Sequence, residues 1–186
     1  MRLSKDSGET VSDKYSKVFK VNQNVLVGFT GSGGAVDVLN KNGIFDKDDC
    51  PSAEDYLEFL WLLLGNKVVD EQNHCNILVL GKSKTNYGFG GNFHMSDDNI
   101  QNQLHLTDHR NVWAPIMTPP NVDYEYYQDL VNSKVQLIIA EQIISPVFSR
   151  GMAIKKIKEI HREIILEISK KDKSVNSNIE QHVIKW

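Results

Sequence analysis

Residues 12–31 of the chain have the sequence SDKYSKVFKVNQNVLVGFTG. The first half of this segment brings in apolar residues typical of a strand, at Tyr15, Val18, Phe19 and Val21. The second half contains a continuous apolar run at residues 25–29, which is typical of a strand covered on both faces. The polar residues 22–24 between the two halves are typical of a turn, so the segment predicts a β-hairpin.

Two helices are predicted to follow the hairpin. Residues 35–41 predict a short helix that ends before Gly43. In the second helix, Ser52 is the predicted N-cap and Asp55 the acidic partner of a capping box, while Gly65 fits the C-terminal end. The apolar residues of this second helix cover a wide arc, which indicates packing against a sheet.

The rest of the chain predicts further strands and helices. In order, these are a buried strand at 77–80, a hairpin partner or close-approach glycine loop at 87–93, helices at 123–132, 134–145 and 152–170, and a strand at 179–186. Between them, the His-, Asp- and Pro-rich residues 95–121 predict an irregular polar insertion. Because strands and helices come in pairs, we expect an α+β fold, as a single domain over residues 1–186.

Composition narrows the classes of function. The chain has 186 residues and a net charge of −3, from 21 basic and 24 acidic residues. This balance argues against nucleic acid as a main partner. The longest apolar run, residues 59–64, is too short to span a bilayer, so we expect no membrane association and a cytoplasmic protein. Cys50 and Cys75 lack a metal or redox spacing and predict free thiols, with Cys75 opening a buried strand where a thiol is inert.

A glycine-rich bend links the hairpin to the first helix. Gly28 and Gly33 have the spacing of a phosphate-binding P-loop, but Gly34-Ala35 stand where that loop has Lys and then Ser or Thr. One hypothesis is therefore a small-ligand or nucleotide-binding module that uses Gly31–Gly34. The bend equally fits an oxyanion site, in which backbone N–H groups at a helix N-terminus bind negative charge, or a plain strand-to-helix turn.

The hairpin and bend resemble the early segment of the N-terminal nucleophile (Ntn) hydrolases, specifically proteasome β-type and bacterial proteasome-like protease subunits. In that family a lysine followed by apolar positions leads through a turn to a strand ending in Gly-x-x-Gly. Here the lysine is Lys17 and the last glycine is Gly31, fourteen residues later. Arg2-Leu3-Ser4 resembles the family's Asp-Ser/Thr-Arg segment, and the resemblance covers about residues 2–40.

The resemblance implies a four-layer αββα sandwich with antiparallel sheets that hydrolyses peptide or amide bonds. Lys17 would supply a positive charge beside the nucleophile, and the Gly31 N–H would stabilise the oxyanion. Ser32 and Gly33 would bind substrate. The resemblance implies no cofactor, and it implies a homo-oligomer.

The family nucleophile is an N-terminal Thr, Ser or Cys on a strand upstream of these motifs. This sequence begins at Met1-Arg2, so we expect the nucleophile and its strand to be absent from it. Whether the chain is an enzyme stays open. It is either a truncated or inactive Ntn hydrolase or a non-catalytic assembly or scaffold subunit of the same fold.

The polar insertion also contains candidate metal ligands, namely Asp97, Asp98, His105, Asp108 and His109. Their side chains are hard or borderline ligands. His105 and His109 could share a face of a helix, but no His-Glu-x-x-His pattern accompanies them. We therefore expect a polar loop and no metal site.

Overall fold

A computed structural model describes residues 3–4, 10–12, 16–31, 33–65, 75–85, 88–96, 99–107, 122–145, 147–173, 175, 179 and 181–182. Contacts divide the chain into two compact units. The helical unit comprises Met1–Tyr15 and Val112–Gln181, and the sheet unit comprises Ser16–Asn111 and His182–Trp186. The single domain expected over residues 1–186 stays a prediction.

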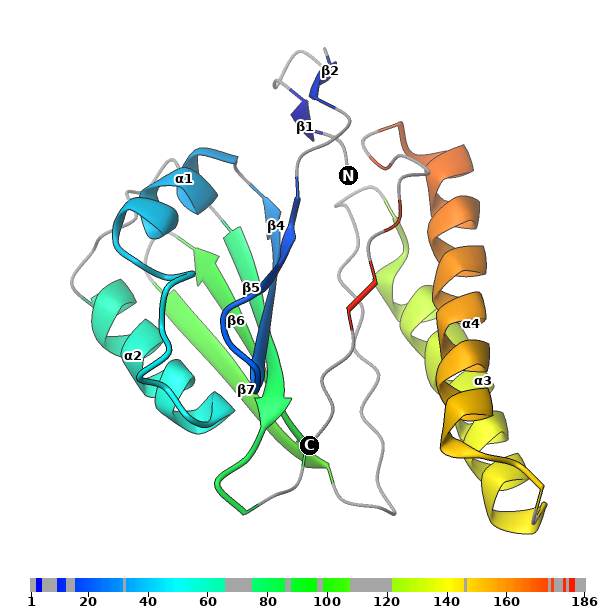
Figure 1. Cartoon of the computed structure of the whole chain (residues 1–186). Helices are drawn as coiled ribbons and strands as arrows, with labels where there is room; N and C mark the ends of the chain where they lie inside the picture. The colour runs from blue at the N-terminus through cyan, green and yellow to red at the C-terminus, as the bar shows by residue number, and fades with distance from the viewer. Residues whose placement is uncertain are drawn as a thin grey trace. The chain divides into compact units, whose positions relative to one another are not determined.

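Five strands form the sheet of the sheet unit, in the order β3-β4-β5-β6-β7 (Figure 1). Every neighbouring pair is antiparallel. The strands are β3 (Val18–Lys20), β4 (Val25–Gly31), β5 (Cys75–Lys82), β6 (Gly88–Ser96) and β7 (Asn99–Thr107). Together with the helices, this sheet confirms an α+β fold with an antiparallel sheet.

The predicted hairpin is strands β3 and β4. Val18 lies opposite Gly28 in the ladder, and the Val21 N–H donates to the Val25 carbonyl at 3.0 Å across the turn. The turn has a second contact, because the side-chain amide of Asn22 donates to the carbonyls of Lys47 and Cys50, each at 2.9 Å. The turn therefore also fixes the segment that leads into the second helix.

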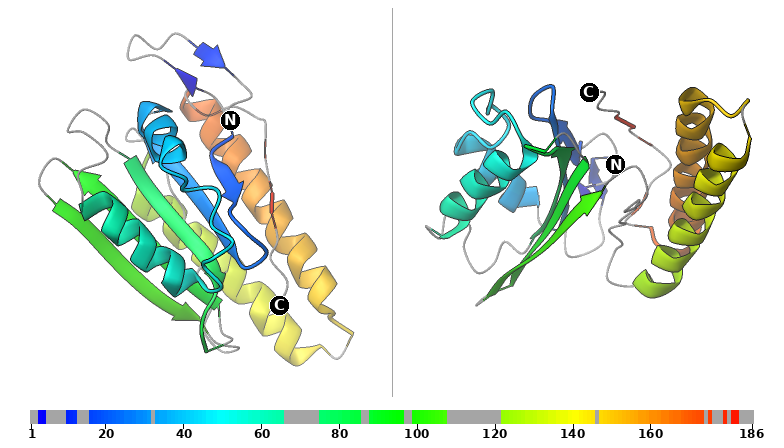
Figure 2. Two further views of the ribbon diagram at one scale, coloured as in Figure 1. Left: turned by 60° about the vertical axis from the view of Figure 1, so that its left-hand side comes forward. Right: turned by 90° about the horizontal axis from the view of Figure 1, so that it is seen from below.

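One face of strands β4 and β5 is fully buried. Its residues recur at every second position of β4 and β5, as a strand's alternation requires, and are Val25, Val27, Phe29, Ile77 and Val79. Helices α1 (Gly33–Lys41) and α2 (Ala53–Gly65) lie on one side of the sheet (Figure 2). Leu26 and Leu78, which alternate with the buried residues, are only partly buried. Complete burial on both faces, which the apolar run predicts, is therefore found on one face.

The ends of the two helices of the sheet unit follow their sequence signals. α1 ends at Lys41, and Gly43 follows with a φ of 75°, a left-handed conformation that glycine adopts without strain. At the start of α2, the Ser52 hydroxyl accepts from the Asp55 N–H at 3.2 Å and donates to the Asp55 carboxylate at 2.6 Å. The Ser52 cap and its Asp55 partner are confirmed, as is Gly65 as the last residue of α2.

Strand β7 corrects the prediction of an irregular insertion at residues 95–121. Residues 99–107 pair with β6 over their whole length, so the expectation is wrong there. The polar composition masked a two-residue recurrence of Ile100, Leu104 and Leu106, which is the pattern of a strand. Residues 97–98 and 108–121 lie outside the described residues. The hairpin partner predicted at residues 87–93 is confirmed by the pairing of β5 with β6.

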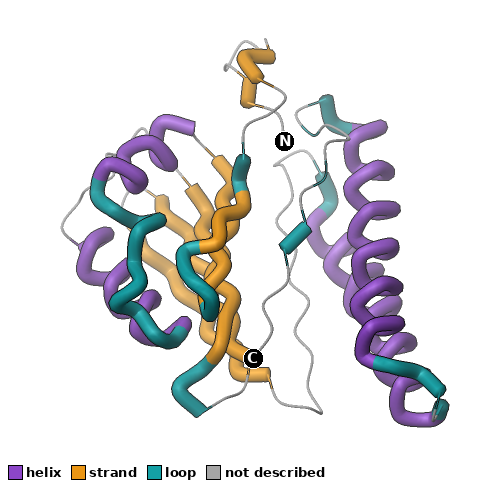
Figure 3. The backbone as a smooth tube through the Cα atoms, in the orientation of Figure 1, coloured by secondary structure: helices purple, strands orange, loops and turns teal. Residues whose placement is uncertain are grey.

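The helical unit contains a small two-stranded sheet and two long helices. Strands β1 (Leu3–Ser4) and β2 (Thr10–Ser12) pair antiparallel. Helices α3 (Tyr124–Ile144) and α4 (Arg150–Lys171) lie side by side, as Figure 3 shows. They share an apolar core of Val122, Tyr127, Val131, Val135, Ile164 and Ile168.

α3 is one helix where the sequence predicts two, at 123–132 and 134–145. Asn132 and Ser133 lie at the predicted break between the two helices, and side chains of their type compete for backbone hydrogen bonds. In the structure the Ser133 hydroxyl donates to the carbonyls of Asp129 at 2.8 Å and Leu130 at 3.1 Å. This hydroxyl therefore folds back onto its own helix, and the helix continues.

α4 confirms the predicted helix at 152–170 and extends it at both ends. Of the strand predicted at 179–186, residues 179, 181 and 182 are described and are not in a strand; the others lie outside the described residues. Within the described part of the chain, no helix combines the length and the apolar character needed to cross a bilayer. A four-layer αββα arrangement would depend on how the two units are placed together, so it stays a prediction.

Candidate functional site

Lys17 immediately precedes β3 and is held there by its backbone. Its carbonyl accepts from the Phe29 N–H at 2.8 Å, which continues the β3–β4 ladder by one pair. The neighbouring Ser16 hydroxyl donates to the Val18 carbonyl at 3.0 Å. These bonds fix Lys17 directly opposite Phe29.

The side chain of Lys17 belongs to the buried face of the sheet. Residues directly opposite each other in an antiparallel pair share a face, so Lys17 lies on the face of Phe29 and of Phe19, two positions along. The rings of Phe19 and Phe29 meet edge to face at 5.9 Å, and Phe19 also stacks on Phe45 at 3.9 Å. Lys17 therefore continues an aromatic cluster at the end of the sheet.

Burial lowers the pKa of the Lys17 ammonium from its usual 10.5, because a charge is less stable away from water. The side chain is half-buried. In the part of the chain that the structure describes, no carboxylate forms an ion pair with it.

Gly31 is the last residue of β4 and lies opposite Cys75, the first residue of β5. It follows the Phe29 position by two residues, so its Cα lies diagonally about 7–8 Å from that of Lys17. Backbone N–H groups point to alternate edges along a strand, and the Phe29 N–H points toward β3. The Gly31 N–H therefore points toward the same edge of β4, on the side of Lys17 and β3.

The other predicted site residues are less well defined. Gly33 is the first residue of α1, directly beyond the end of β4. Ser32 lies outside the described residues. The structure thus brings Lys17 and Gly31 to one end of the sheet, with the start of α1 beside them, and assigns no contact to Ser32 or Gly33.

One polar contact at this end of the sheet had no signal in the sequence. The side-chain amide of Asn76 donates to the Thr30 hydroxyl at 3.4 Å, across the β4–β5 pair. Both residues alternate with the buried positions and so lie on the opposite face from Lys17. The contact between Asn76 and Thr30 depends on the register between β4 and β5, two strands that are far apart in the sequence. No local sequence pattern contains that register.

A second polar cluster joins the β5–β6 connection to the start of α2. The Ser83 hydroxyl, which is buried, donates to the Glu54 carboxylate, and the Lys84 N–H donates to the same carboxylate at 3.1 Å. The Lys84 ammonium pairs with Asp55 at 2.6 Å. Hydrogen bonds from Lys84 and then Ser52 lower the pKa of Asp55. These groups satisfy one another, so the cluster stabilises the fold.

Neither metal chemistry nor a cysteine nucleophile gains support. Among the described residues, no three His, Cys, Asp or Glu side chains gather as a metal site would require. Of the candidate ligands only His105 is described, as a backbone position in β7. Cys50 is buried and not in a disulfide, and burial, followed by the charge of Asp49, raises the pKa of its thiol. A raised thiol pKa disfavours the reactive thiolate.

Comparisons with known proteins give distant likenesses in fold and no match in sequence. No protein-family model and no curated protein matches the sequence. Among solved structures, the chain is similar to the crystal structure of eukaryotic HslV from Trypanosoma brucei, with 11% identity and a TM-score of 0.42. The match covers 95% of this chain and 84% of that chain. A likeness at this TM-score carries no argument about activity, substrate or assembly.

Proposed function

We propose that the chain is a proteasome-like Ntn-hydrolase domain of four-layer αββα architecture, and that Lys17 and the Gly31 N–H are its contribution to an amide-hydrolysing site. The observation that carries the proposal is the ladder bond from the Phe29 N–H to the Lys17 carbonyl. Through this bond, the half-buried Lys17 cation lies at the same end of the β3–β4 pair as the Gly31 N–H, which points toward the β3 side of β4.

The proposed chemistry gives each of the two groups a role. The hydroxyl or thiol of an N-terminal Thr, Ser or Cys attacks the amide carbon while its proton passes to a base, the terminal amine. The Gly31 N–H donates to the oxyanion that forms, and the Lys17 cation favours the deprotonated nucleophile. The C–N bond then breaks, the leaving amine takes the proton, and water hydrolyses the ester or thioester. The proposal assigns no nucleophile within residues 1–186.

Burial makes Lys17 suited to this role. An ammonium whose pKa is lowered exchanges its proton nearer to neutral pH than an exposed lysine does. Because no carboxylate neutralises it within the described chain, its charge stays available to an adjacent reacting group. A peptide or amide substrate, a homo-oligomeric state and a cytoplasmic location belong to the same proposal, by resemblance.

A second candidate, a non-catalytic assembly subunit of the same fold, has its own support. Large apolar side chains are exposed on both units, among them Trp61 and Leu62 on α2 and Ile143, Ile144 and Val147 near the end of α3. Contiguous exposed apolar surface is typical of proteins that bind other proteins. The same experiment distinguishes the two candidates.

Because the proposal assigns no nucleophile within residues 1–186, the test supplies one: it measures cleavage of fluorogenic peptide amides by the chain fused behind a strand with an N-terminal threonine, and by lysine variants of this fusion. We expect Lys17→Ala to lower the cleavage rate by about 100-fold or more, the scale on which positioned proton-transfer and charge-stabilising groups act. Lys20→Ala is the matched control, because Lys20 is an exposed lysine on the same strand. Lys17→Ala is also expected to leave folding intact.

Each outcome has a defined meaning. Cleavage that survives Lys17→Ala removes Lys17 from the site and overturns the proposal. Absence of cleavage by the threonine-bearing fusion favours the assembly subunit. A nucleotide-dependent rise in melting temperature would favour the ligand-binding module at Gly31–Gly34 instead.

A further inference from the structure

The turn between α3 and α4 exposes a cluster of large apolar side chains at one end of the helix pair (Figure 1). Ile143 and Ile144 end α3 with 79% and 80% of their surface exposed, and Val147 in the connection is 81% exposed. Met152 in the first turn of α4 is 48% exposed. We call these four side chains the apolar tip. Contiguous exposed apolar surface rimmed by polar groups is typical of a site that binds a protein or a membrane.

The turn that carries the apolar tip is closed by its own polar contacts. The Ser145 N–H donates to the Glu141 carbonyl at 2.9 Å, and the Phe148 N–H donates to the Ser145 carbonyl at 3.1 Å. The Lys156 ammonium pairs with the Glu141 carboxylate and lies 5.2 Å from the centre of the Phe148 ring. The end of α3 is therefore tied to the start of α4, and the apolar side chains are exposed on a turn whose backbone is hydrogen-bonded.

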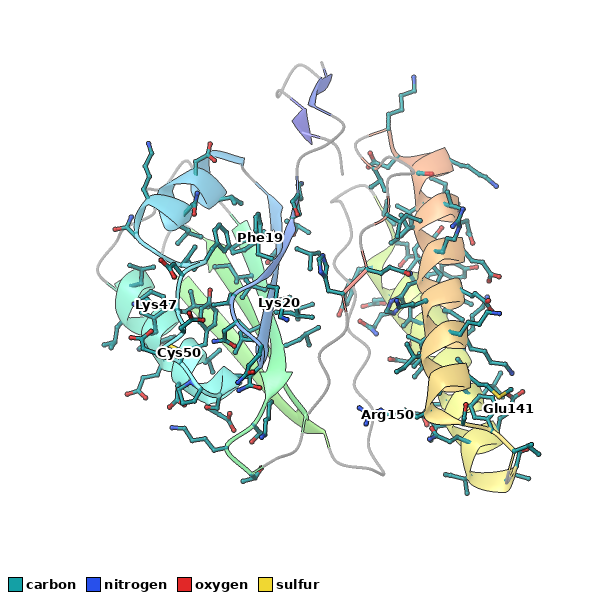
Figure 4. The ribbon with its side chains drawn as sticks, viewed as in Figure 1. Phe19, Lys20, Lys47, Cys50, Glu141 and Arg150 are labelled. Carbon is teal, nitrogen blue, oxygen red and sulfur yellow. The ribbon has the colours of Figure 1, made fainter. Side chains whose placement is uncertain are left out.

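The charges around the apolar tip are basic. Residues 141–156 contain three basic residues and one acidic residue, a net charge of +2 in a chain whose net charge is −3. The acidic residue, Glu141, is paired with Lys156. Arg150 and Lys155 are exposed, and no described carboxylate forms an ion pair with either. Figure 4 shows Arg150 and Glu141 at the same end of the helix pair.

We propose that the apolar tip binds the surface of an anionic lipid membrane. The four apolar side chains enter the boundary between headgroups and acyl chains, where their surface is removed from water. Arg150 and Lys155 stay at the level of the headgroups and attract the negative charge of acidic lipids. The apolar side chains supply the insertion, and the cations supply the preference for anionic lipid.

The form and the charge of the tip favour a lipid surface over a protein as its occupant. A protein covers projecting side chains only where it has a surface of complementary shape. A bilayer has no fixed shape and takes up projecting apolar groups at its interface. The local positive charge, opposite in sign to that of the whole chain, is complementary to an anionic membrane.

Binding to a membrane surface differs from crossing the membrane. The expectation of no membrane association rests on apolar runs too short to span a bilayer, and no helix of the described chain could span one. Surface binding requires only a few apolar side chains beside cations. The inference goes beyond the proposed hydrolase function and does not depend on it, because the tip includes neither Lys17 nor Gly31.

Cosedimentation of the full chain with lipid vesicles tests the binding. One set of vesicles contains phosphatidylcholine alone, and the other contains phosphatidylcholine and phosphatidylserine in equal amounts. We expect the partition constant to be about tenfold or more higher for the vesicles with phosphatidylserine, and to fall as salt is added.

Two variants of α3 distinguish the tip from the rest of the helix. Ile144→Ser should lower the partition constant about tenfold, because one large apolar side chain no longer enters the lipid. Leu137→Ser is the matched control, since Leu137 is 68% exposed on α3 but lies about 10 Å farther from the turn. It should leave the partition constant unchanged.

Two charge reversals distinguish the cations at the tip from the net charge of the chain. Arg150→Glu with Lys155→Glu should remove most of the preference for phosphatidylserine and leave binding to phosphatidylcholine alone unchanged. Arg162→Glu with Lys170→Glu changes the net charge equally at exposed positions of α4 outside the tip, and should keep the preference. Thermal unfolding should show that every variant folds.

Three results would overturn the proposal. The first is absence of binding to either kind of vesicle, or an equal loss of binding in Ile144→Ser and Leu137→Ser. The second is a preference for phosphatidylserine that persists after reversal of Arg150 and Lys155. The third comes from sedimentation velocity without vesicles: a mass above that of the 21.1 kDa monomer that Ile144→Ser lowers would show that a second copy, and not lipid, covers the tip.

Discussion

Gly81 in β5 lies against the turn of the β3–β4 hairpin. A Cβ atom at this position would lie 2.3 Å from the Asn24 carbonyl oxygen and 3.1 Å from the Cβ of Ala53. The carbonyl is fixed, because it also accepts from the Lys82 N–H at 2.9 Å. A side chain at position 81 would therefore push the backbone of β5 away from the backbone of the hairpin turn at Asn24.

We predict that Gly81→Ala lowers the free energy of unfolding by about 1–3 kcal/mol or more, as overpacking of a core does. Urea denaturation measures the change. The matched control is Gly151→Ala in α4, where the nearest atom is the Ser149 hydroxyl oxygen at 3.7 Å. There the substitution should stabilise by up to about 1 kcal/mol through helix propensity, and equal effects at both sites would contradict the prediction.

The buried ammonium of Lys17 should make stability depend on pH. Its pKa is lowered in the folded state, so between that lowered value and 10.5 the unfolded chain binds more protons than the folded one. The free energy of unfolding therefore gains a contribution that rises with pH across this interval. The destabilisation caused by the charge is complete below the lowered pKa and disappears above 10.5.

Lys17→Met keeps the length of the side chain without its charge. We expect it to raise the free energy of unfolding at neutral pH, with a gain that shrinks toward pH 10.5. Urea denaturation at several pH values gives this difference, and Lys20→Met is the control. A gain that is constant with pH, or one that grows, would show that burial of the charge is not its cause.

The hairpin that places Lys17 opposite Phe29 could be predicted from the sequence. The role of Lys17 and Gly31 as site residues is implied by the resemblance and stays a prediction. The role of Asn22 could not be predicted. Its amide reaches carbonyls 25 and 28 residues later. Local pattern indicates a turn, whereas the partner of a turn side chain depends on how the rest of the chain returns to it.

At the scale of elements, one group of polar contacts joins α3 to α4. The Tyr127 hydroxyl donates to the Glu167 carboxylate at 2.9 Å and accepts from the Lys171 ammonium at 2.7 Å. The hydrogen bonds from Tyr127 and then Lys171 lower the pKa of Glu167, and that to Tyr127 contributes most to raising the pKa of Lys171. The Tyr127 ring itself lies in the core of the two helices.

We predict that Tyr127→Phe lowers the free energy of unfolding by about 1–2 kcal/mol, because a buried hydroxyl bonded to charged groups is lost while the ring is kept. Chemical denaturation followed by circular dichroism provides the measurement. Tyr124→Phe is matched in chemistry, since its exposed hydroxyl donates only to Gln128 at 3.2 Å within α3. It should change stability by less than about 0.5 kcal/mol; a similar loss in both variants would refute the interhelical role.

Helices and strands with a regular spacing of apolar residues could be predicted from the sequence. Those in which apolar spacing and polar composition disagree could not. The isoleucine spacing of α4 predicts its helix, and the capping residues predict both ends of α2. For α3 the sequence predicts two helices, whereas the structure has one, whose Val131 and Val135 on either side of the predicted break lie in the same core. For β7, the polar composition indicates a loop, but pairing with β6 along its whole length makes the segment a strand.

At the scale of the whole molecule, the chain divides into a sheet unit and a helical unit. The sheet unit starts with the hairpin and the helical unit resumes within the polar insertion, at Val112. Residues 1–15 belong to the helical unit although they precede the hairpin in sequence. The chain therefore leaves one unit and returns to it, an arrangement that no local pattern in the sequence indicates.

The side-chain hydrogen bonds of Asn22 and Asn24 have a consequence for how the sheet unit is held together. These side chains bind the carbonyls of Lys47, Cys50 and Pro51, and so tie a loop of more than twenty residues at its two ends. Small secreted proteins close loops of such length with a covalent cross-link between sulfur atoms. Here two amide groups close the loop, so it can open and re-form without any change in oxidation state.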